Sequence, residues 1–170
     1  MANKEIKMSP DKMIISKTDK QGKIIYVNHE FLQISGFERL ELLGKPHNVI
    51  RHVDMPRGVF HLLWKVLQSG GEFNGFVKNR CKDGGYYWVF ATVSSSIAED
   101  GKTLLGYFSA RRKASEQGVE FFSQLYQEMK KKESGLSGKK ACEASVHYLE
   151  EICAQKELSY DQLVVQYQSS

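Results

Sequence analysis

The chain has 170 residues, 41% of them hydrophobic, which is enough for one compact domain with a buried core and an appended segment. The formal net charge of +4 comes from scattered lysines and not from a concentrated basic face, so nucleic-acid binding is not indicated. We expect a cytoplasmic protein, because no apolar run approaches the roughly 20 residues of a membrane span and the N-terminus lacks the apolar core of a signal peptide.

Two short β-branched runs open the chain. Residues 13–18 and 23–27 are separated by a turn containing Asp19 and Gly22, and this pattern predicts a hairpin. From Asn28 onward the apolar spacing changes and favours short helices, broken at Ser35-Gly36 and at Gly44. Asn28 itself is either a helix cap or a ligand contact.

Residues 44–56, GKPHNVIRHVDMP, concentrate polar side chains between two prolines. Such a short fenced segment is expected to bury no apolar face, since each proline biases its predecessor away from helix. Its polar side chains therefore either contact something other than a core or belong to a solvated turn. They are His47, Asn48, Arg51, His52 and Asp54.

An amphipathic helix follows Pro56. Val59, Phe60, Leu63, Trp64 and Leu67 share one face of it, and it is expected to stop at a pair of glycines. Trp64 is a core residue, a wall of a binding site, or both.

Three longer strands come next, over residues 73–82, 86–97 and 103–111. Along the second of these, alternation places Tyr87 with Val89 and Ala91 on one face, and Trp88 with Phe90 and Thr92 on the other.

The remainder reads as helical. An apolar spacing of three and four from residue 115 predicts a helix to 133, residues 133–138 form a hinge, and an apolar stripe and a capping box at Ser159 and Gln162 predict two more helices. These stripes are buried on the sheet, on each other or on a partner.

The order of these elements resembles the PAS fold. More specifically, NHEFLQISGF (28–37), GKPHNVIRHVDMP (44–56), LLW (62–64), GFVKNRCKDGGYYWVFA (75–91) and GYFSARRKAS (106–115) resemble the FAD-binding PAS domain of aerotaxis (Aer) receptors. One position departs from the family pattern, because Val53 stands where the family usually has proline. Aer receptors continue into a membrane anchor and a signalling coiled coil, which this sequence lacks. In this respect the sequence is similar to stand-alone PAS proteins of the CetB type.

The resemblance implies an α+β fold with a five-stranded antiparallel sheet, short helices on one face and a C-terminal helical tail. The expected segments are an N-terminal cap (1–12), the PAS domain (13–114), a helix (115–133) and a helical tail that binds a partner (134–170).

It also implies a site for FAD. Arg51 and His52 would meet the pyrophosphate, Asn28 and Asn79 the polar ring edge, and Trp64, Tyr87 and Trp88 the flat ring. Asn48 belongs to the same polar segment. Asp54 is expected to fix Arg51 or His52 or to cap the next helix.

The implied function is non-enzymatic: a redox sensor that passes the state of bound FAD to a membrane-bound chemotaxis transducer, with a homodimer left open. A haem-binding gas sensor is the first alternative, with His47, His52, His61 and His147 as candidate ligands. A cofactor-free PAS interaction module is the second. Blue-light adduct chemistry would need a cysteine in segment 44–56, which has none, and Cys81 is expected on a strand.

Overall fold

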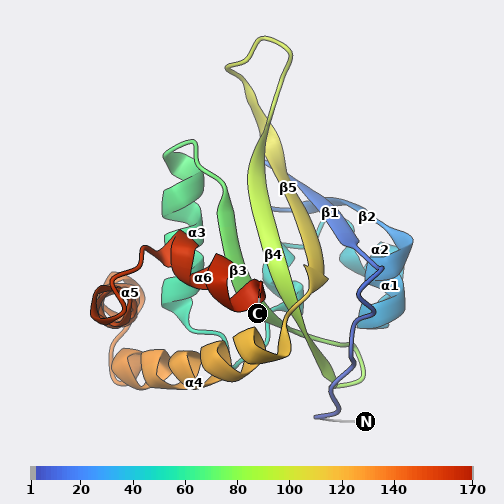
Figure 1. Cartoon of the computed structure of the whole chain (residues 1–170). Coiled ribbons are helices and arrows are strands. Elements are labelled where there is room, and N and C mark those ends of the chain that lie inside the picture. The colour runs from blue at the N-terminus through green and yellow to red at the C-terminus, as the bar shows by residue number, and fades with distance from the viewer. Residues whose placement is uncertain (1–2, 170) are drawn as a thin grey trace.

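The computed structural model describes residues 3–169 and is built on a five-stranded antiparallel sheet in the order β2-β1-β5-β4-β3 (Figure 1). The strands are β1 (Ile14–Asp19), β2 (Ile24–Val27), β3 (Phe73–Arg80), β4 (Tyr86–Ile97) and β5 (Leu104–Lys113). The predicted fold class, α+β with a five-stranded antiparallel sheet, is confirmed. Strand β3 ends two residues earlier than predicted, so Cys81 follows the strand.

Four short helices carry the chain from one edge of the sheet to the other, and three more follow the last strand. They are α1 (His29–Ser35), α2 (Arg39–Leu42), the 3-10 helix η1 (His47–Ile50), α3 (Arg57–Gln68), α4 (Glu116–Glu133), α5 (Gly138–Gln155) and α6 (Tyr160–Gln168). The predicted helix breaks are confirmed: Gly36, at a φ of 75°, ends α1, and Gly44, at a φ of 79°, follows α2.

The polar segment 44–56 was predicted to bury no apolar face, and this prediction is wrong. Ile50 is 1% exposed and Met55 is 5% exposed, so both side chains belong to the core. The segment achieves this without a long helix, because one turn of 3-10 helix turns Ile50 inward. The same turn leaves His47, Asn48 and Arg51 free to face elsewhere.

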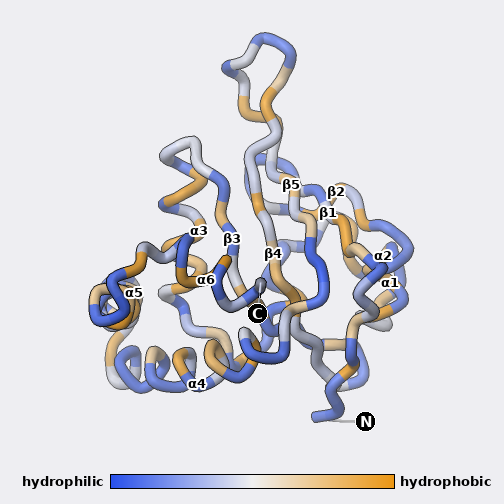
Figure 2. The backbone as a smooth tube through the Cα atoms, in the orientation of Figure 1, coloured by the Kyte–Doolittle hydropathy of each residue, from blue (hydrophilic) through white to orange (hydrophobic). Residues whose placement is uncertain are grey.

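The predicted alternation of side chains along β4 is confirmed, and it gives the sheet two distinct faces. We call inner the face that carries Val77, Ala91 and Val93, and outer the face that carries Phe76 and Phe90. Both faces are covered by helices, and Figure 2 shows apolar stretches in the central strands between them. The predicted amphipathic helix α3 lies over the inner face and buries Val59 and Leu67.

Helix α4 covers the outer face at β3 and β4. Phe122 stacks on Phe76 with 4.6 Å between ring centroids, and Tyr126 stacks on Trp88 at 6.1 Å. The Tyr126 hydroxyl also donates a hydrogen bond of 2.6 Å to the backbone carbonyl of Phe76. A helix with its apolar stripe on aromatic strands removes a large area from water, so α4 is an integral layer of the domain.

The two last helices continue around the edge of the sheet (Figure 1). Helix α5 packs against α3 and α4, and α6 packs against β3, where Tyr160 stacks on Phe73 at 5.8 Å. The predicted capping box is confirmed, since Ser159 and Gln162 exchange hydrogen bonds at the start of α6. Of the surfaces considered for the tail, it uses the sheet and the other helices.

The N-terminal segment lies beside the start of β4. The described part begins at residue 3, so the first two residues of the predicted cap fall outside it. The amide of Ile6 donates to the carbonyl of Tyr86 at 2.8 Å, and Met8 is buried.

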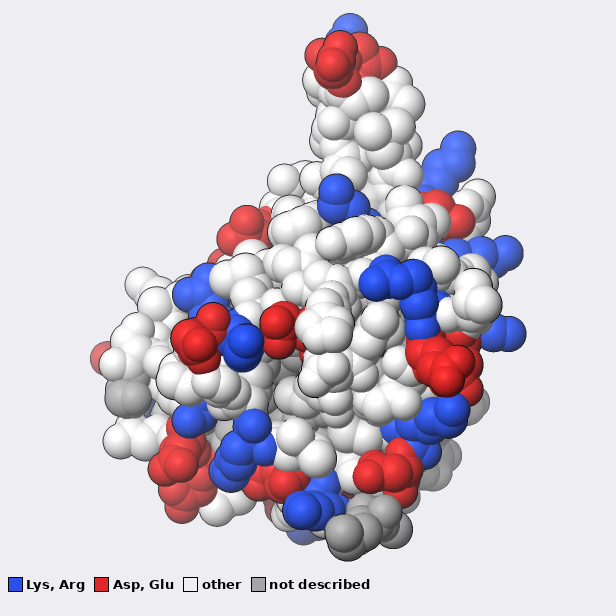
Figure 3. Space-filling model, turned by 90° about the vertical axis from the view of Figure 1, so that its right-hand side faces the viewer, with Lys and Arg blue, Asp and Glu red and all other residues white. Residues whose placement is uncertain are grey.

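At the other end of the sheet, the β4–β5 hairpin projects beyond its neighbours, and charged side chains gather at its tip (Figure 3). Across residues 3–169, the helices are all too short or too polar to span a bilayer.

Candidate functional site

A cavity of about 280 Å³ lies between the inner face of the sheet and the helices η1 and α3. Side chains from β1, β3, β4 and β5 form its floor, and η1, α3 and the β1–β2 turn form its rim. The cavity exists because the strands contribute small residues, such as Ser16, Ala91 and Ser109, where a packed core would carry Leu or Phe. A concave site of this size between a sheet and a helix suits a small flat ligand.

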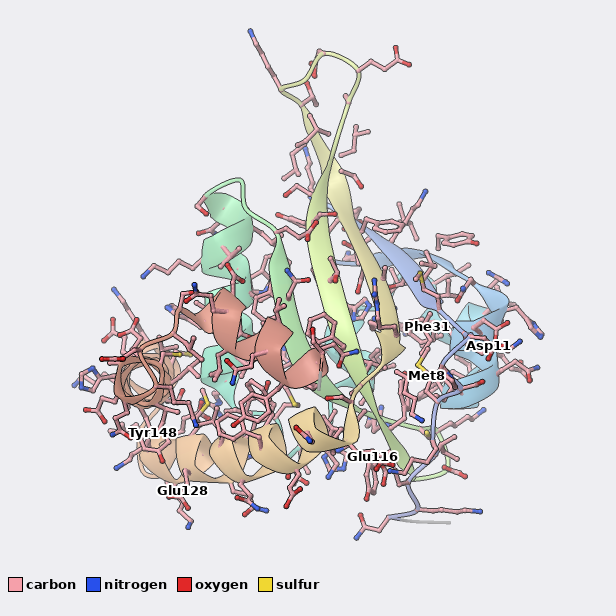
Figure 4. The ribbon with its side chains drawn as sticks, viewed as in Figure 1. Met8, Asp11, Phe31, Glu116, Glu128 and Tyr148 are labelled. Atoms are coloured by element: carbon pink, nitrogen blue, oxygen red, sulfur yellow. The ribbon has the colours of Figure 1, made fainter. Side chains whose placement is uncertain are left out.

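The floor holds a buried cation, the guanidinium of Arg111 on β5. Its Nη2 donates to Ser16 Oγ at 2.7 Å and its Nη1 to His47 Nε2 at 3.0 Å. Its Cζ lies 4.9 Å from the centroid of the Phe31 ring, a cation–π contact (Phe31 is labelled in Figure 4). Among the described residues that line the cavity none is acidic, and Arg111 Nε has no hydrogen-bond partner. Arg111 is therefore a charge without a protein counter-charge.

His47 is held neutral by this arrangement. Because an arginine guanidinium is only a donor, His47 Nε2 must accept its hydrogen bond. Burial, and secondarily the charge of Arg111, lower the pKa of His47 to about 3. Burial also lowers the pKa of Arg111 to about 10, which leaves it charged at neutral pH. The floor of the cavity thus carries one fixed positive charge and one neutral imidazole.

The walls are aromatic. Trp64 on α3 packs edge-on against Tyr107 on β5 with 5.0 Å between centroids, and 39% of Trp64 remains exposed. Opposite the floor, the guanidinium of Arg51 lies 3.6 Å from the centroid of the Phe60 ring. Burial lowers the pKa of Arg51, and its Nε has no hydrogen-bond partner. Asn79, 3% exposed, brings a carboxamide to the same cavity from β3.

Of the nine residues predicted to hold a ligand, the structure brings four together around the cavity: Asn48, Arg51, Trp64 and Asn79. It places five elsewhere. Asn28 caps α1, as its first interpretation predicted: its Oδ1 accepts from the amides of Ile15 and Phe31, and its Nδ2 donates to the Met13 carbonyl at 2.9 Å. Its amide is fully engaged by backbone.

Of the other four, His52 and Asp54 lie beside the cavity, in the segment between Arg51 and α3. His52 Nδ1 accepts from the Asp54 amide at 3.0 Å, and the Asp54 carboxylate pairs with Lys78 at 2.7 Å. Asp54 was expected to fix Arg51 or His52 or to cap α3; it contacts His52 at 3.6 Å, while the N-cap of α3 is Pro56, with no side-chain cap hydrogen bond. Its pKa is lowered, chiefly by the hydrogen bond from Lys78. These charges border the cavity segment and do not enter it.

Tyr87 and Trp88 cannot both face one ligand, because neighbouring residues on a strand point to opposite faces. Tyr87 is buried on the inner face, opposite Asn79 on β3, and within residues 3–169 its hydroxyl makes no hydrogen bond. Burial raises the pKa of Tyr87. Trp88 stacks on Tyr126 of α4 on the outer face. Of the two, only Tyr87 is on the side of the cavity.

Sequence reasoning missed Arg111, Ser16 and Ser109. A signal was present: Tyr107, Ser109 and Arg111 alternate along β5, so one inward residue fixes the direction of all three.

Val53, which replaces the family proline, sits second in a turn closed by the Met55 amide and the His52 carbonyl at 3.1 Å. That turn position favours proline, so valine leaves the backbone path compatible with the family pattern.

The candidate haem ligands are spread over the molecule. The Nε2 of His47 is occupied by Arg111, and His147 on α5 pairs with Glu151 at 3.0 Å. Within residues 3–169 no three His, Cys, Asp or Glu side chains come together in a way that could hold a metal ion. Cys81 is buried away from the cavity lining, donates to the Ile34 carbonyl, and has its pKa raised to about 11 by burial.

Comparison with known proteins supports this reading of the fold. Residues 24–106 match a family model described as the PAS fold. The chain is 40% identical to the aerotaxis receptor of Escherichia coli K12 over 119 residues, which is 70% of this chain and 23% of the receptor. It is 28% identical to the nitrogen fixation regulatory protein of Klebsiella oxytoca over 59% of this chain and 20% of that protein. The chain thus spans less than a quarter of either relative.

Solved structures show the same architecture. A light-oxygen-voltage domain studied with a flavin analogue superposes with a TM-score of 0.57 at 21% identity, over 66% of this chain and 83% of that chain. The light state of the blue-light photoreceptor Aureochrome1 LOV superposes with a TM-score of 0.56 at 16% identity, over 72% of this chain and 93% of that chain. At these identities the likeness concerns the fold.

Proposed function

Residues 24–106 match the PAS family, and from that premise we propose that the chain is an aerotaxis-type redox sensor that binds FAD non-covalently in the cavity. One observation carries the proposal: among residues 3–169, the buried Arg111 guanidinium on the cavity floor has no acidic side chain beside it in the cavity lining. A buried charge is retained against its desolvation when something pairs with it. A ligand with an electron-rich polar edge would supply that partner.

The cavity suits the ring system of a flavin. Its volume of about 280 Å³ holds a flat ring, so the remainder of the dinucleotide would lie outside it. Trp64 and Phe60 offer aromatic surface, and the Asn79 carboxamide offers the paired donor and acceptor that a flavin ring edge requires. Arg51 adds a second guanidinium with a free Nε near the rim.

Bound FAD would supply the redox chemistry, and the residues of the chain would set its conditions. Arg111 places a positive charge where added negative charge is stabilised, and His47 stays neutral, so it neither adds a second charge nor releases a proton at pH 7. A change of charge at the ring would then alter the hydrogen bonds of Asn79 and Arg111.

The relatives suggest where the signal goes. The E. coli relative is an aerotaxis receptor, and a second, BdlA of Pseudomonas aeruginosa, is a biofilm dispersion protein that is 30% identical over 51% of this chain. We propose that the chain acts in the cytoplasm and passes the flavin state to a separate membrane-bound chemotaxis transducer. The surface that meets this partner would belong to α4, α5 and α6, which follow the PAS domain and pack on it.

The test is an absorption spectrum of the purified full chain, followed by extraction and identification of the bound compound. We expect the flavin bands and FAD as the extracted species. Asn79→Leu should reduce flavin content, whereas Asn74→Leu, on the same strand but bonded to Thr92, should not. A colourless protein that does not take up added FAD would contradict the proposal, and a Soret band with extracted haem would favour the gas-sensor alternative.

A further inference from the structure

Glu133 stands at the wrong end of its own helix. It is the last residue of α4 and follows Lys130, Lys131 and Lys132. Because the C-terminus of a helix carries partial negative charge, lysines there are favourable and a glutamate is unfavourable. A carboxylate in this position needs a partner outside α4.

That partner is the N-terminus of α3. Glu133 Oε1 accepts a hydrogen bond of 2.9 Å from the amide of Gly58, in the first turn of α3. The N-cap residue of α3 is Pro56, whose side chain offers no hydrogen bond, and the first turn of α3 has no acidic residue. The carboxylate therefore acts as a cap supplied from 75 residues away, in the place where the helix dipole favours negative charge.

The same oxygen also holds α5. Ser145 Oγ donates to Glu133 Oε1 at 2.7 Å, so α3, α4 and α5 meet at one carboxylate. The joint is closely packed, because a Cβ at Gly58 would come within 2.1 Å of Ser145 Oγ. Glycine at position 58 is thus what lets α5 approach α3.

This joint lies next to the cavity. Helix α3 carries three of its lining residues, Phe60, Leu63 and Trp64, within two turns of Gly58. One turn before Glu133, Lys130 Nζ donates to the carbonyl of Val53, in the segment that leads from Arg51 to α3. The end of α4 therefore contacts both α3, which forms one wall of the cavity, and the segment between Arg51 and α3.

We propose that Glu133 is a positioning residue that couples occupancy of the cavity to docking of the C-terminal helices. This rests on the proposed function, since the occupant is FAD. With Glu133 in place, α3 is held in the position that forms the cavity, and α5 is held on α3. Ligand binding and tail docking then stabilise each other, and by linkage each strengthens the other to the same extent.

The experiment is amide hydrogen exchange on the full chain, with and without FAD, for the wild type, Glu133→Ala and Glu133→Gln. Glu128→Gln is the matched control, because Glu128 lies on the outward side of α4 (Figure 4) and its ion pair within the described chain is with Lys131 on the same helix. Without ligand, Glu133→Ala should raise exchange about tenfold in α5 and the first turn of α3, as expected for loss of a charged cap. Glu133→Gln, which keeps an acceptor oxygen, should raise it less. Strands β4 and β5 should be unchanged and so report intact folding.

With FAD bound, α5 should gain protection in the wild type and in Glu128→Gln but not in Glu133→Ala, whose FAD affinity should also be lower. If ligand-free Glu133→Ala shows the same amide exchange rates as the wild type in α5 and the first turn of α3, Glu133 does not hold these helices together. Equal FAD-induced protection of α5 in the wild type and in Glu133→Ala would overturn Glu133 as the coupling residue. Absence of FAD binding by the wild type would overturn the proposed function and the coupling together, while the ligand-free comparison would still decide whether Glu133 fastens the tail.

Discussion

Replacing Arg111 with methionine should separate ligand binding from stability. Methionine keeps much of the volume and removes the charge. In a packed core, removing a residue that donates two hydrogen bonds would normally destabilise the fold. Here the donor is a buried cation with no acidic partner among the described residues that line the cavity, so relief of its desolvation should offset much of that loss in the ligand-free protein.

The size of each term follows from the structure. Burial lowers the pKa of Arg111 from its ordinary 12.5 to about 10, which corresponds to about 3 kcal/mol against the charged form in the folded state. The two hydrogen bonds that this cation donates, to Ser16 and His47, contribute about 1.5–3 kcal/mol each in the other direction. The hydrogen bond of 3.0 Å between Ser16 Oγ and His47 Nε2 remains after replacement and keeps both groups paired. We therefore expect the unfolding free energy to fall by at most about 3 kcal/mol.

The effect on FAD should be large, because a hydrogen bond to a charged group contributes about 1.5–3 kcal/mol, and its loss weakens binding about 10- to 100-fold. The assays are denaturant unfolding of the ligand-free protein and titration with FAD. Arg112→Met is the control, since Arg112 is exposed on the outer face, one residue away. Unchanged FAD affinity in Arg111→Met would refute the role given to this charge, and so would a loss of more than about 3 kcal/mol in stability that Arg112→Met does not share.

Three further changes test the fold around the site by denaturant unfolding. Val53→Pro should stabilise the protein by roughly 0.5–1 kcal/mol, because residue 53 holds the second position of its turn and proline restricts the unfolded chain. Gly118→Ala should destabilise it despite the better helix propensity of alanine, because a Cβ there would come within 2.1 Å of the Phe76 ring. Lowering the pH from 7 to 5 should reduce the unfolding free energy by about 2 kcal/mol through His47. The pKa of His47 is about 3 in the folded protein and 6.5 in the unfolded chain, so the unfolded chain takes up the proton first. Stability therefore falls as the pH falls below 6.5.

Two of these predictions have a matched control. Gln117→Ala, one residue before Gly118 and exposed, should be neutral or slightly stabilising; equal behaviour of the two variants would contradict the close packing of α4 on β3. His47→Gln should lose most of the pH dependence, while His147→Gln, on the surface of α5, should keep it. A less stable Val53→Pro would mean that the turn does not accept the family residue.

Periodicity was sufficient to predict the elements of this fold. The hairpin, the amphipathic α3, the meander and the capping box of α6 all follow from local spacing, and local spacing is what sets them. Burial within segment 44–56 was not predictable in this way. A single 3-10 turn is too short to show a period, so nothing in the sequence marks Ile50 as a core residue.

Membership of the cavity was only partly predictable, for a geometric reason. Residue type suggests what Asn28 and Trp88 can do, but the direction of the side chain decides what they contact. Asn28 lies where a helix begins, and its amide is used by the backbone. Trp88 is out of phase with Tyr87 on one strand, so a choice between them required knowing which face is inner.

The alternation of side chains along the strands also explains why Arg111, which the sequence analysis missed, matters. On the inner face, β4 presents Val89, Ala91 and Val93, whereas the paired strands β1 and β5 present Ser16, Ser109 and Arg111. A face meant only for core packing would be apolar throughout, because a buried polar group without a partner is unfavourable. A sheet that is apolar along one side of a cavity and basic along the other would instead orient a flat ligand by its own polarity. The floor of the cavity therefore specifies a direction for the ligand as well as a shape, and Arg111 is the residue that distinguishes the two ends.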